Sequence, residues 1–169
     1  MGRVSPPALR EAARAALAEA MVLGQSRSVE QDLEYAVRQL VEIALRALSP
    51  GINDPFTAIG VLDRLGATLA GLVGRVLPDG VFRRDGEVRL VRPATDYAGL
   101  ADAMFHMLRQ GAAGQPAVMI RMLEVLAAVA AVEPDPARRA VLARHAGLAR
   151  HAALGGTRDP AARRAIRSR

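Results

Sequence analysis

The sequence contains no cysteine and no lysine. Without cysteine the chain can form no disulfide, use no thiolate as a nucleophile and offer no sulfur ligand to a metal ion. Without lysine it has neither a Schiff-base amine nor the lysine of a P-loop. The patterns G-x-G-x-x-G and G-x-S-x-G are also missing, so the common dinucleotide and acyl-transfer sites have no support.

Aromatic residues are scarce, at 3% of the chain, although 51% of it is hydrophobic. Alanine, leucine and valine supply most of the apolar content, and alanine favours helix because it loses no side-chain entropy there. The core is therefore expected to consist of small aliphatic side chains on closely packed helices. A chain of 169 residues is long enough for one such core.

No apolar run is long enough to span a bilayer, which needs about 20 residues. The most apolar window, residues 117–132, is interrupted by Arg121 and Glu124. The sequence as it stands predicts a soluble chain.

Acidic residues are nearly missing from the C-terminal segment 138–169, which has nine arginines and the single acid Asp159. A basic segment can contact nucleic acid or an anionic membrane surface, or it can be a solvated helix end. Nucleic acid is the least favoured partner, because the aromatic platform that binds single strands is lacking.

Apolar residues recur at helical spacing through most of the chain. Helices are predicted within residues 5–24, 26–50, 53–76, 95–115, 116–134, 135–156 and 158–169. The dipeptides Asp54-Pro55, Asp135-Pro136 and Asp159-Pro160 are expected to begin three of them, since aspartate caps a helix and proline suits its first position. The apolar face of segment 53–76 would extend from Ile59 to Val76.

The period changes at residues 80–91, where two short β-prone runs flank Asp85-Gly86, a strong hairpin signal. An isolated hairpin is marginally stable, so it is expected to lie on the helices or on a partner chain. The predicted fold is all-α: a bundle of about six or seven helices with one small β-hairpin. Residues 1–155 would form a single domain, followed by a basic helix or tail at 156–169.

Polar residues recur at three- and four-residue steps along segment 26–50 and so share one face of the expected helix. These residues are Asp32, Tyr35, Gln39, Glu42, Arg46 and Ser49. The face would point toward the loop that holds Asn53 and Asp54. It could be an ordinary solvated face, with Glu42 and Arg46 as an i,i+4 pair worth about 0.2–0.5 kcal/mol.

The same face could instead form a polar cleft. In that interpretation Arg46 would hold an anion. Alternatively, three carboxylates would hold a hard divalent cation such as magnesium or calcium, namely Asp32, Glu42 and Asp54. The histidines at 106, 145 and 151 have no metal-ligand spacing, and each is interpreted as a surface or hydrogen-bonded residue rather than a ligand.

Residues 26–65 closely resemble the signature of a bacterial predicted membrane protein family, domain of unknown function 2254. The matching elements are Gln31-Asp32, Arg38 to Val41, Arg46 to Pro50, Ile52 to Pro55 and Thr57-Ala58. The resemblance covers roughly residues 6 to 155. It implies transmembrane helices before this region, as partners of the domain.

The resemblance favours a functional or assembly role for the polar junction, because the motif includes groups that helix capping does not need, notably Arg46. The candidate residues for a ligand-binding or polar junction are Asp32, Arg38, Gln39, Glu42, Arg46, Ser49, Asn53, Asp54 and Thr57.

The favoured function is a soluble helical domain of a bacterial inner-membrane protein, on the cytoplasmic side, with a role in ligand sensing, transport support or assembly. No cofactor is expected in that case. The basic C-terminus would face anionic lipid. The alternative is a metal-dependent enzyme that uses the acidic cluster with a divalent cation. A homo-oligomer is also expected, because the hairpin edge and the first helix offer surfaces for a second copy.

Overall fold

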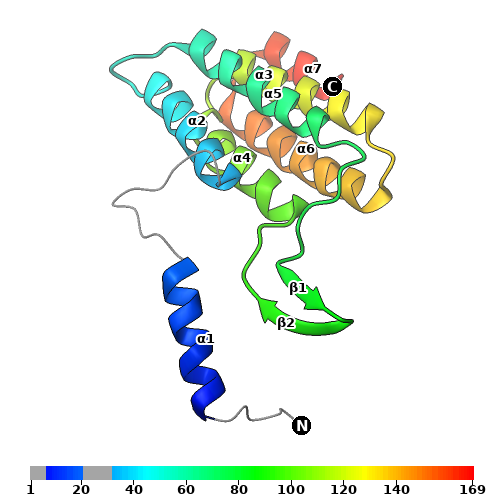
Figure 1. Cartoon of the computed structure of the whole chain (residues 1–169). Helices are drawn as coiled ribbons and strands as arrows, with labels where there is room; N and C mark the ends of the chain where they lie inside the picture. Colours follow the sequence, from blue (N-terminus) through cyan, green and yellow to red (C-terminus); the bar gives the residue numbers. More distant parts are fainter. Residues whose placement is uncertain (1–6, 21–31) are drawn as a thin grey trace. The chain divides into compact units, whose positions relative to one another are not determined.

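The structure is a computed structural model that describes residues 7–20 and 32–169. These residues form seven helices and one two-stranded antiparallel hairpin, which confirms the predicted all-α fold (Figure 1). The chain divides into two compact units, Met1–Asp32 and Leu33–Arg169. In the first unit, helix α1 (Pro7–Ala20) has exposed side chains from Arg10 onward.

The second unit holds the remaining elements in a helical bundle. They are α2 (Leu33–Ala47), α3 (Pro55–Gly71), β1 (Val81–Arg84), β2 (Glu87–Val91), α4 (Tyr97–Gly111), α5 (Pro116–Val132), α6 (Pro136–Gly156) and α7 (Pro160–Arg167). Helix α5 packs against α3, α6 and α7, while α2 packs against α3 and α4.

The three predicted Asp-Pro helix starts are confirmed. Asp54 and Asp159 each accept two hydrogen bonds from backbone N–H groups of the first helical turn and Asp135 accepts one, with proline at the first position in each helix. Proline costs nothing there, because that N–H has no partner within the helix. These caps set where α3, α6 and α7 begin.

The core is aliphatic, as the composition predicts, with Phe105 among its few aromatic members. On α4 the large apolar residues that recur at helical spacing are buried: Tyr97, Leu100, Met104, Phe105 and Leu108. The inward face of α3 is shorter than predicted, because the helix ends at Gly71 and the chain turns. Val76 therefore lies beyond the helix and is 94% exposed.

The hairpin forms at the predicted position. Asp85 and Gly86 have φ values of 54° and 76°, the left-handed conformations that a two-residue type I′ turn requires. Phe82 pairs with Leu90, and an irregularity after Phe82 places Arg83 opposite Val88. Apart from the half-buried first residue of β1, all side chains of the two strands are exposed. The hairpin extends from the bundle between α3 and α4 (Figure 1).

Candidate functional site

The corner between α2 and α3, residues 48–54, is a tight hydrogen-bonded turn. The Ser49 carbonyl accepts from the N–H groups of Ile52 (3.0 Å) and Asn53 (2.8 Å), and the Ala47 carbonyl accepts from Asp54 (2.8 Å). Asn53 has a φ of 48°, in the left-handed region that asparagine tolerates better than most residues. The backbone therefore fixes how the corner is built.

Three predicted site residues hold this corner in place. The Asp54 carboxylate caps α3 and also accepts from the Thr57 hydroxyl at 2.5 Å. The hydrogen bond from that hydroxyl is the main cause that lowers the pKa of Asp54. The side-chain oxygen of Asn53 accepts from the Gln115 amide at 2.9 Å, which ties the corner to the start of α5. We call this contact the Asn53–Gln115 clasp.

The charged residues of α2 form pairs along the helix. Arg38 donates to Glu34, with Nε 3.0 Å from Oε1, and Arg46 lies 2.5 Å from Glu42. The Arg46 and Glu42 side chains are 75% and 50% exposed, so this pair contributes little to stability. Gln39 is exposed as well, whereas Asp32 is half-buried.

Glu42 and Asp54, two of the three carboxylates of the metal hypothesis, have separate partners. Glu42 pairs with Arg46, and both oxygens of Asp54 accept hydrogen bonds at the start of α3. Within residues 7–20 and 32–169, no group of three or more His, Asp or Glu side chains is arranged to hold a metal ion. Binding of a divalent cation by Asp32, Glu42 and Asp54 stays an alternative that metal titration can test.

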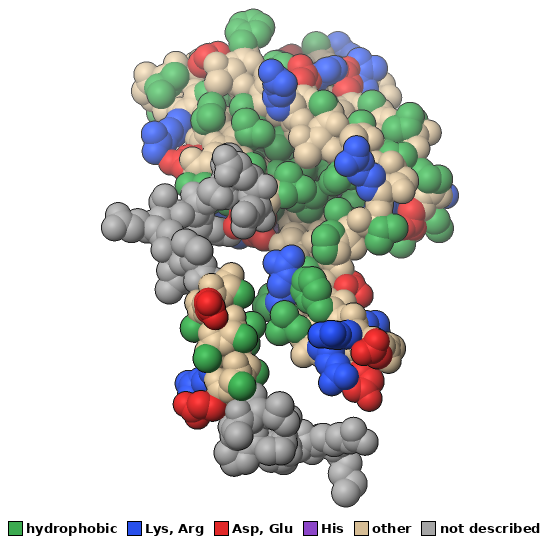
Figure 2. Space-filling model, viewed as in Figure 1, with side chains coloured by type: hydrophobic (Ala, Val, Ile, Leu, Met, Phe, Trp, Pro, Cys, Tyr) green, Lys and Arg blue, Asp and Glu red, His purple; other side chains and the backbone are tan. Residues whose placement is uncertain are grey.

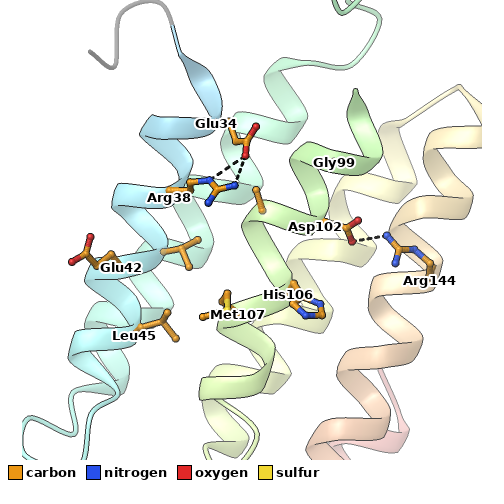
Figure 3. A pocket seen from close by; sticks show the side chains of 11 residues that line it. Glu34, Arg38, Glu42, Leu45, Gly99, Asp102, His106, Met107 and Arg144 are labelled. Carbon is orange, nitrogen blue, oxygen red and sulfur yellow. Dashed lines mark hydrogen bonds and ion pairs between the residues drawn. The ribbon is translucent and has the colours of Figure 1, made fainter. Parts of the chain in front are cut away.

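A groove of about 660 Å³ lies between α2, α4 and α6 (Figure 3). Two predicted site residues, Arg38 and Glu42, are among the residues that line it. The full lining is Glu34, Arg38, Val41, Glu42, Leu45, Gly99, Asp102, Ala103, His106, Met107 and Arg144. The other seven predicted site residues lie outside this lining. Ser49, Asn53 and Asp54 lie in the corner and Thr57 in the first turn of α3, whereas Asp32, Gln39 and Arg46 lie in neither place.

Two carboxylate–arginine pairs stand at the groove. Glu34 pairs with Arg38 on α2, and its second oxygen accepts from the Thr95 hydroxyl at 2.6 Å. Asp102 on α4 accepts from Arg144 on α6 at 2.7 Å. The side chains of Asp102 and Arg144 are each about half exposed, at 49% and 48%. Both of their charges are therefore accessible from the groove.

The floor between these pairs is apolar, formed by Val41, Leu45, Ala103 and Met107. Met107 is 54% exposed, so its thioether side chain is accessible from the groove. In Figure 3 its side chain points toward α2 and Leu45, whereas Glu42 extends away from α4. The groove thus offers an apolar surface beside charges of both signs.

His145 on α6 is buried behind this groove and only 1% exposed. Its Nε2 lies 3.2 Å from Asp102 Oδ1, its ring is 5.6 Å from that of Phe105, and its Nδ1 contacts no hydrogen-bond partner among the described residues. Burial is the main cause that lowers the pKa of His145, while the hydrogen bond from Arg144 lowers the pKa of Asp102. The histidine therefore favours its neutral form.

Nine groove residues were not among the predicted site residues, and five of them carry a charge, an imidazole or an exposed thioether: Glu34, Asp102, His106, Met107 and Arg144. The available signal was weak: Asp102 and His106 share an i,i+4 spacing on a helix whose residues are mostly apolar. Asp102 and Arg144 are 42 positions apart, and no local pattern indicates which helices become neighbours.

The last part of the basic C-terminal segment folds against the core as α7. Ile166 is fully buried, and Arg163 donates to the carbonyls of Leu154 (2.6 Å) and Thr157 (3.0 Å). Arg169 pairs with Glu124 on α5 at 2.9 Å. Part of the positive charge of this segment therefore stabilises the fold, and its contact with lipid stays a prediction.

Comparisons with known proteins agree with the signature in residues 26–65. Uncharacterized proteins of Mycobacterium bovis and of two strains of Mycobacterium tuberculosis are 41% identical to the chain over 118 residues. That match covers 69% of this chain and 23% of each relative, so the chain spans about a quarter of their length. No solved structure gives a significant match.

A membrane span requires a helix that is both long and apolar. None of the described helices α1 to α7 meets both requirements. The family model described as Predicted membrane protein (DUF2254) matches residues 1–128, more than half of the chain. The chain therefore belongs to this family of predicted membrane proteins, as its signature predicts.

Proposed function

We propose that this region is a non-catalytic ligand-binding domain of a bacterial membrane protein and that the groove between α2, α4 and α6 is its site. The ligand would be a small zwitterionic molecule with an apolar body. The observation that supports this proposal is that accessible charges of opposite sign, Arg38 and Asp102, lie on two walls of one groove with an apolar floor.

The charges favour a zwitterion over a simple ion. Arg38 is 62% exposed and can bind a carboxylate, while Asp102 is 49% exposed and can bind an ammonium group. A lone anion would meet repulsion from Glu34 and Asp102, and a lone cation would meet repulsion from Arg38 and Arg144. A molecule with both groups can satisfy the two walls at once.

The apolar floor would supply most of the affinity. Leu45 and Met107 can cover an aliphatic ligand body, and burying each methylene contributes about 0.8 kcal/mol. The groove volume of about 660 Å³ lies within the usual range for small-molecule sites, roughly 300–1,000 Å³. The charged groups would then set orientation and selectivity.

In the whole protein, the domain would report ligand binding to transmembrane segments of the same polypeptide, at the cytoplasmic side of the inner membrane. The matched region makes up 23% of the curated relatives, which leaves room for such segments there. A homo-oligomer would bring several grooves together. A basic C-terminal segment on the cytoplasmic side agrees with the positive-inside tendency.

The dipeptide leucyl-leucine is a suitable probe, because it combines an ammonium group, a carboxylate and two aliphatic side chains. Binding can be followed by NMR of methionine methyl groups, since Met107 is exposed in the groove whereas Met119 and Met122 are fully buried. We expect the dipeptide to shift the Met107 signal and to leave those of Met119 and Met122 in place.

N-acetylated and C-amidated forms of the dipeptide each lack one charge and should bind several-fold more weakly. Arg38→Gln and Asp102→Asn should weaken binding of the unmodified dipeptide to a similar degree. Arg89→Gln, on the hairpin and 57% exposed, is the matched control and should bind normally. An unmoved Met107 signal at high dipeptide concentration, or equal binding of all three forms, would refute the zwitterion site.

A further inference from the structure

His145 is a buried titratable side chain in direct contact with a charged residue of the groove. It lies on α6 and is only 1% exposed, and its Nε2 is 3.2 Å from Asp102 Oδ1. Arg144 contacts the same oxygen at 2.7 Å. A change of charge on the His145 ring therefore acts at once on Asp102, the carboxylate that one wall presents to the groove.

The contacts of the His145 ring assign the proton of its neutral form to Nε2. A proton on this nitrogen can be donated to the Asp102 carboxylate, whereas Nδ1 is buried without a hydrogen-bond partner among the described residues. Arg144 Nη2 also lies 3.2 Å from Nε2, but it is closer to Asp102. Neutral His145 is therefore a hydrogen-bond donor to Asp102.

The charged groups that act on His145 come from two helices. They are Asp102, His106 and Arg109 on α4 and Arg144 on α6. None of them lies on α5 or α7, the other helices that pack against α6. Burial is the main cause that lowers the pKa of His145, Arg144 acts in the same direction, and Asp102 opposes both. His145 is therefore neutral near pH 7 and gains a proton in acid.

The contacts from α6 leave part of the Asp102 carboxylate for a ligand. Arg144 and His145 both contact Oδ1, and none of the described residues forms a hydrogen bond with Oδ2. The Asp102 side chain is about half exposed at the groove. An ammonium group can therefore bind at Oδ2 while both contacts on Oδ1 persist.

We propose that His145 is a positioning residue of this site and makes ligand binding depend on pH. Neutral His145 donates to Asp102 and helps to hold the carboxylate that binds the ligand's ammonium group. Protonated His145 places a positive charge at the same carboxylate, and this charge repels the ammonium group. The inference rests on the proposed function, because it concerns the zwitterion site of the groove. Its consequence is release of the ligand in acid.

The expected weakening follows from the short distance between the two positive charges. Two unit charges roughly 6 Å apart in a partly solvated site repel enough to weaken binding by roughly three- to tenfold. Charges farther away act less, since salt screens them over about 10 Å. Figure 2 shows such surface charges, with arginine and acidic side chains interspersed over one face of the bundle. The contact between His145 and Asp102 is therefore expected to dominate the pH dependence.

Binding of leucyl-leucine, followed through the Met107 methyl signal between about pH 7 and pH 5, tests the inference. The dipeptide keeps both terminal charges over most of this range. We expect its dissociation constant to rise as His145 gains a proton. By linkage, saturating dipeptide should lower the pKa of His145 by the same factor, measured from the imidazole NMR signals of the unchanged chain.

Two variants of His145 separate its charge from its hydrogen bond. His145→Gln keeps a neutral N–H donor near the position of Nε2 and cannot gain a proton, so its dissociation constant should not rise in acid. His145→Leu removes the donor and should bind the dipeptide more weakly at about pH 7 than His145→Gln does. Circular dichroism would verify that both variants keep their fold.

His106→Gln is the matched control, because His106 also lines the groove but contacts Gln110, at 3.2 Å. In this variant the dissociation constant should still rise in acid. A rise that disappears only with His106→Gln would assign the pH dependence to His106 and overturn the role of His145.

The remaining outcomes distinguish this inference from the proposed function. An unmoved Met107 signal throughout the pH range would refute the zwitterion site, and the inference with it. Binding that does not weaken in acid, or that still weakens with His145→Gln, would overturn the role of His145 alone. An unchanged pKa of His145 with saturating dipeptide would do the same without any variant. Equal binding of His145→Gln and His145→Leu at about pH 7 would overturn the positioning role.

Discussion

The end of α6 packs so closely on the α4–α5 turn that one added methyl group is expected to destabilise the domain. A Cβ at Gly156 would stand 2.0 Å from the carbonyl oxygen of Ala113 and 2.5 Å from its carbon. Ordinary contact begins at 3.4 Å, so the two backbones would have to separate by about 1.4 Å. The obstacle is backbone rather than a flexible side chain, so it cannot rotate away.

The expected cost follows from this geometry. Overpacking of this kind costs about 1–3 kcal/mol, and a backbone obstacle places Gly156→Ala near the upper end. Replacing glycine by alanine in a helix recovers up to about 1 kcal/mol. A net loss of about 2 kcal/mol in the free energy of unfolding remains, which corresponds to roughly 4–8 °C in Tm for a chain of this size.

Gly155→Ala is the matched control, because a Cβ at Gly155 would have no described atom within 4 Å. It should leave the free energy of unfolding unchanged or raise it slightly. Urea unfolding followed by circular dichroism would compare the two variants with the unchanged chain. If Gly156→Ala unfolds at the same urea concentration as Gly155→Ala, the close contact with Ala113 is wrong.

Two further predictions concern titration and metal ions. Burial lowers the pKa of His145, so as the pH falls through about 6.5 the unfolded chain protonates this histidine before the folded chain does. The contribution of His145 to the free energy of unfolding should therefore be fully present above that pH and decline below it. His145→Gln should flatten this decline in urea unfolding measured at several pH values, and an unchanged slope would contradict the assignment. Titration with magnesium, manganese or calcium should leave Tm unchanged, because both oxygens of Asp54 already accept hydrogen bonds; a rise in Tm would support the metal hypothesis instead.

The parts of the fold that sequence could predict depend on local chemistry. An aspartate followed by proline satisfies the first turn of a helix by itself, and Asp85-Gly86 forms its turn without help from distant residues. The apolar period of α4 likewise fixes which side chains enter the core. Each of these signals lies within a few consecutive residues, so a single sequence contains it.

The candidate site was only partly predictable, because it depends on which helices become neighbours. Arg38 and Glu42 stand out on α2, but their placement opposite Asp102 requires that α4 pack beside α2. The end of α3 was also missed, since Val76 continues the apolar period although the chain has already turned after Gly71. Periodicity indicates a possible face and does not show where tertiary packing ends a helix.

The Asn53–Gln115 clasp gives a structural meaning to one part of the signature, residues 46–58. Its residues join α2, α3 and α5 at one corner, and the groove lies along other residues of the bundle. Another protein that carries the same short pattern would be expected to share this arrangement of helices while accepting a different ligand. Residues of this short pattern therefore predict how the helices are arranged. The ligand that a relative binds would have to be predicted from the residues that line its own groove.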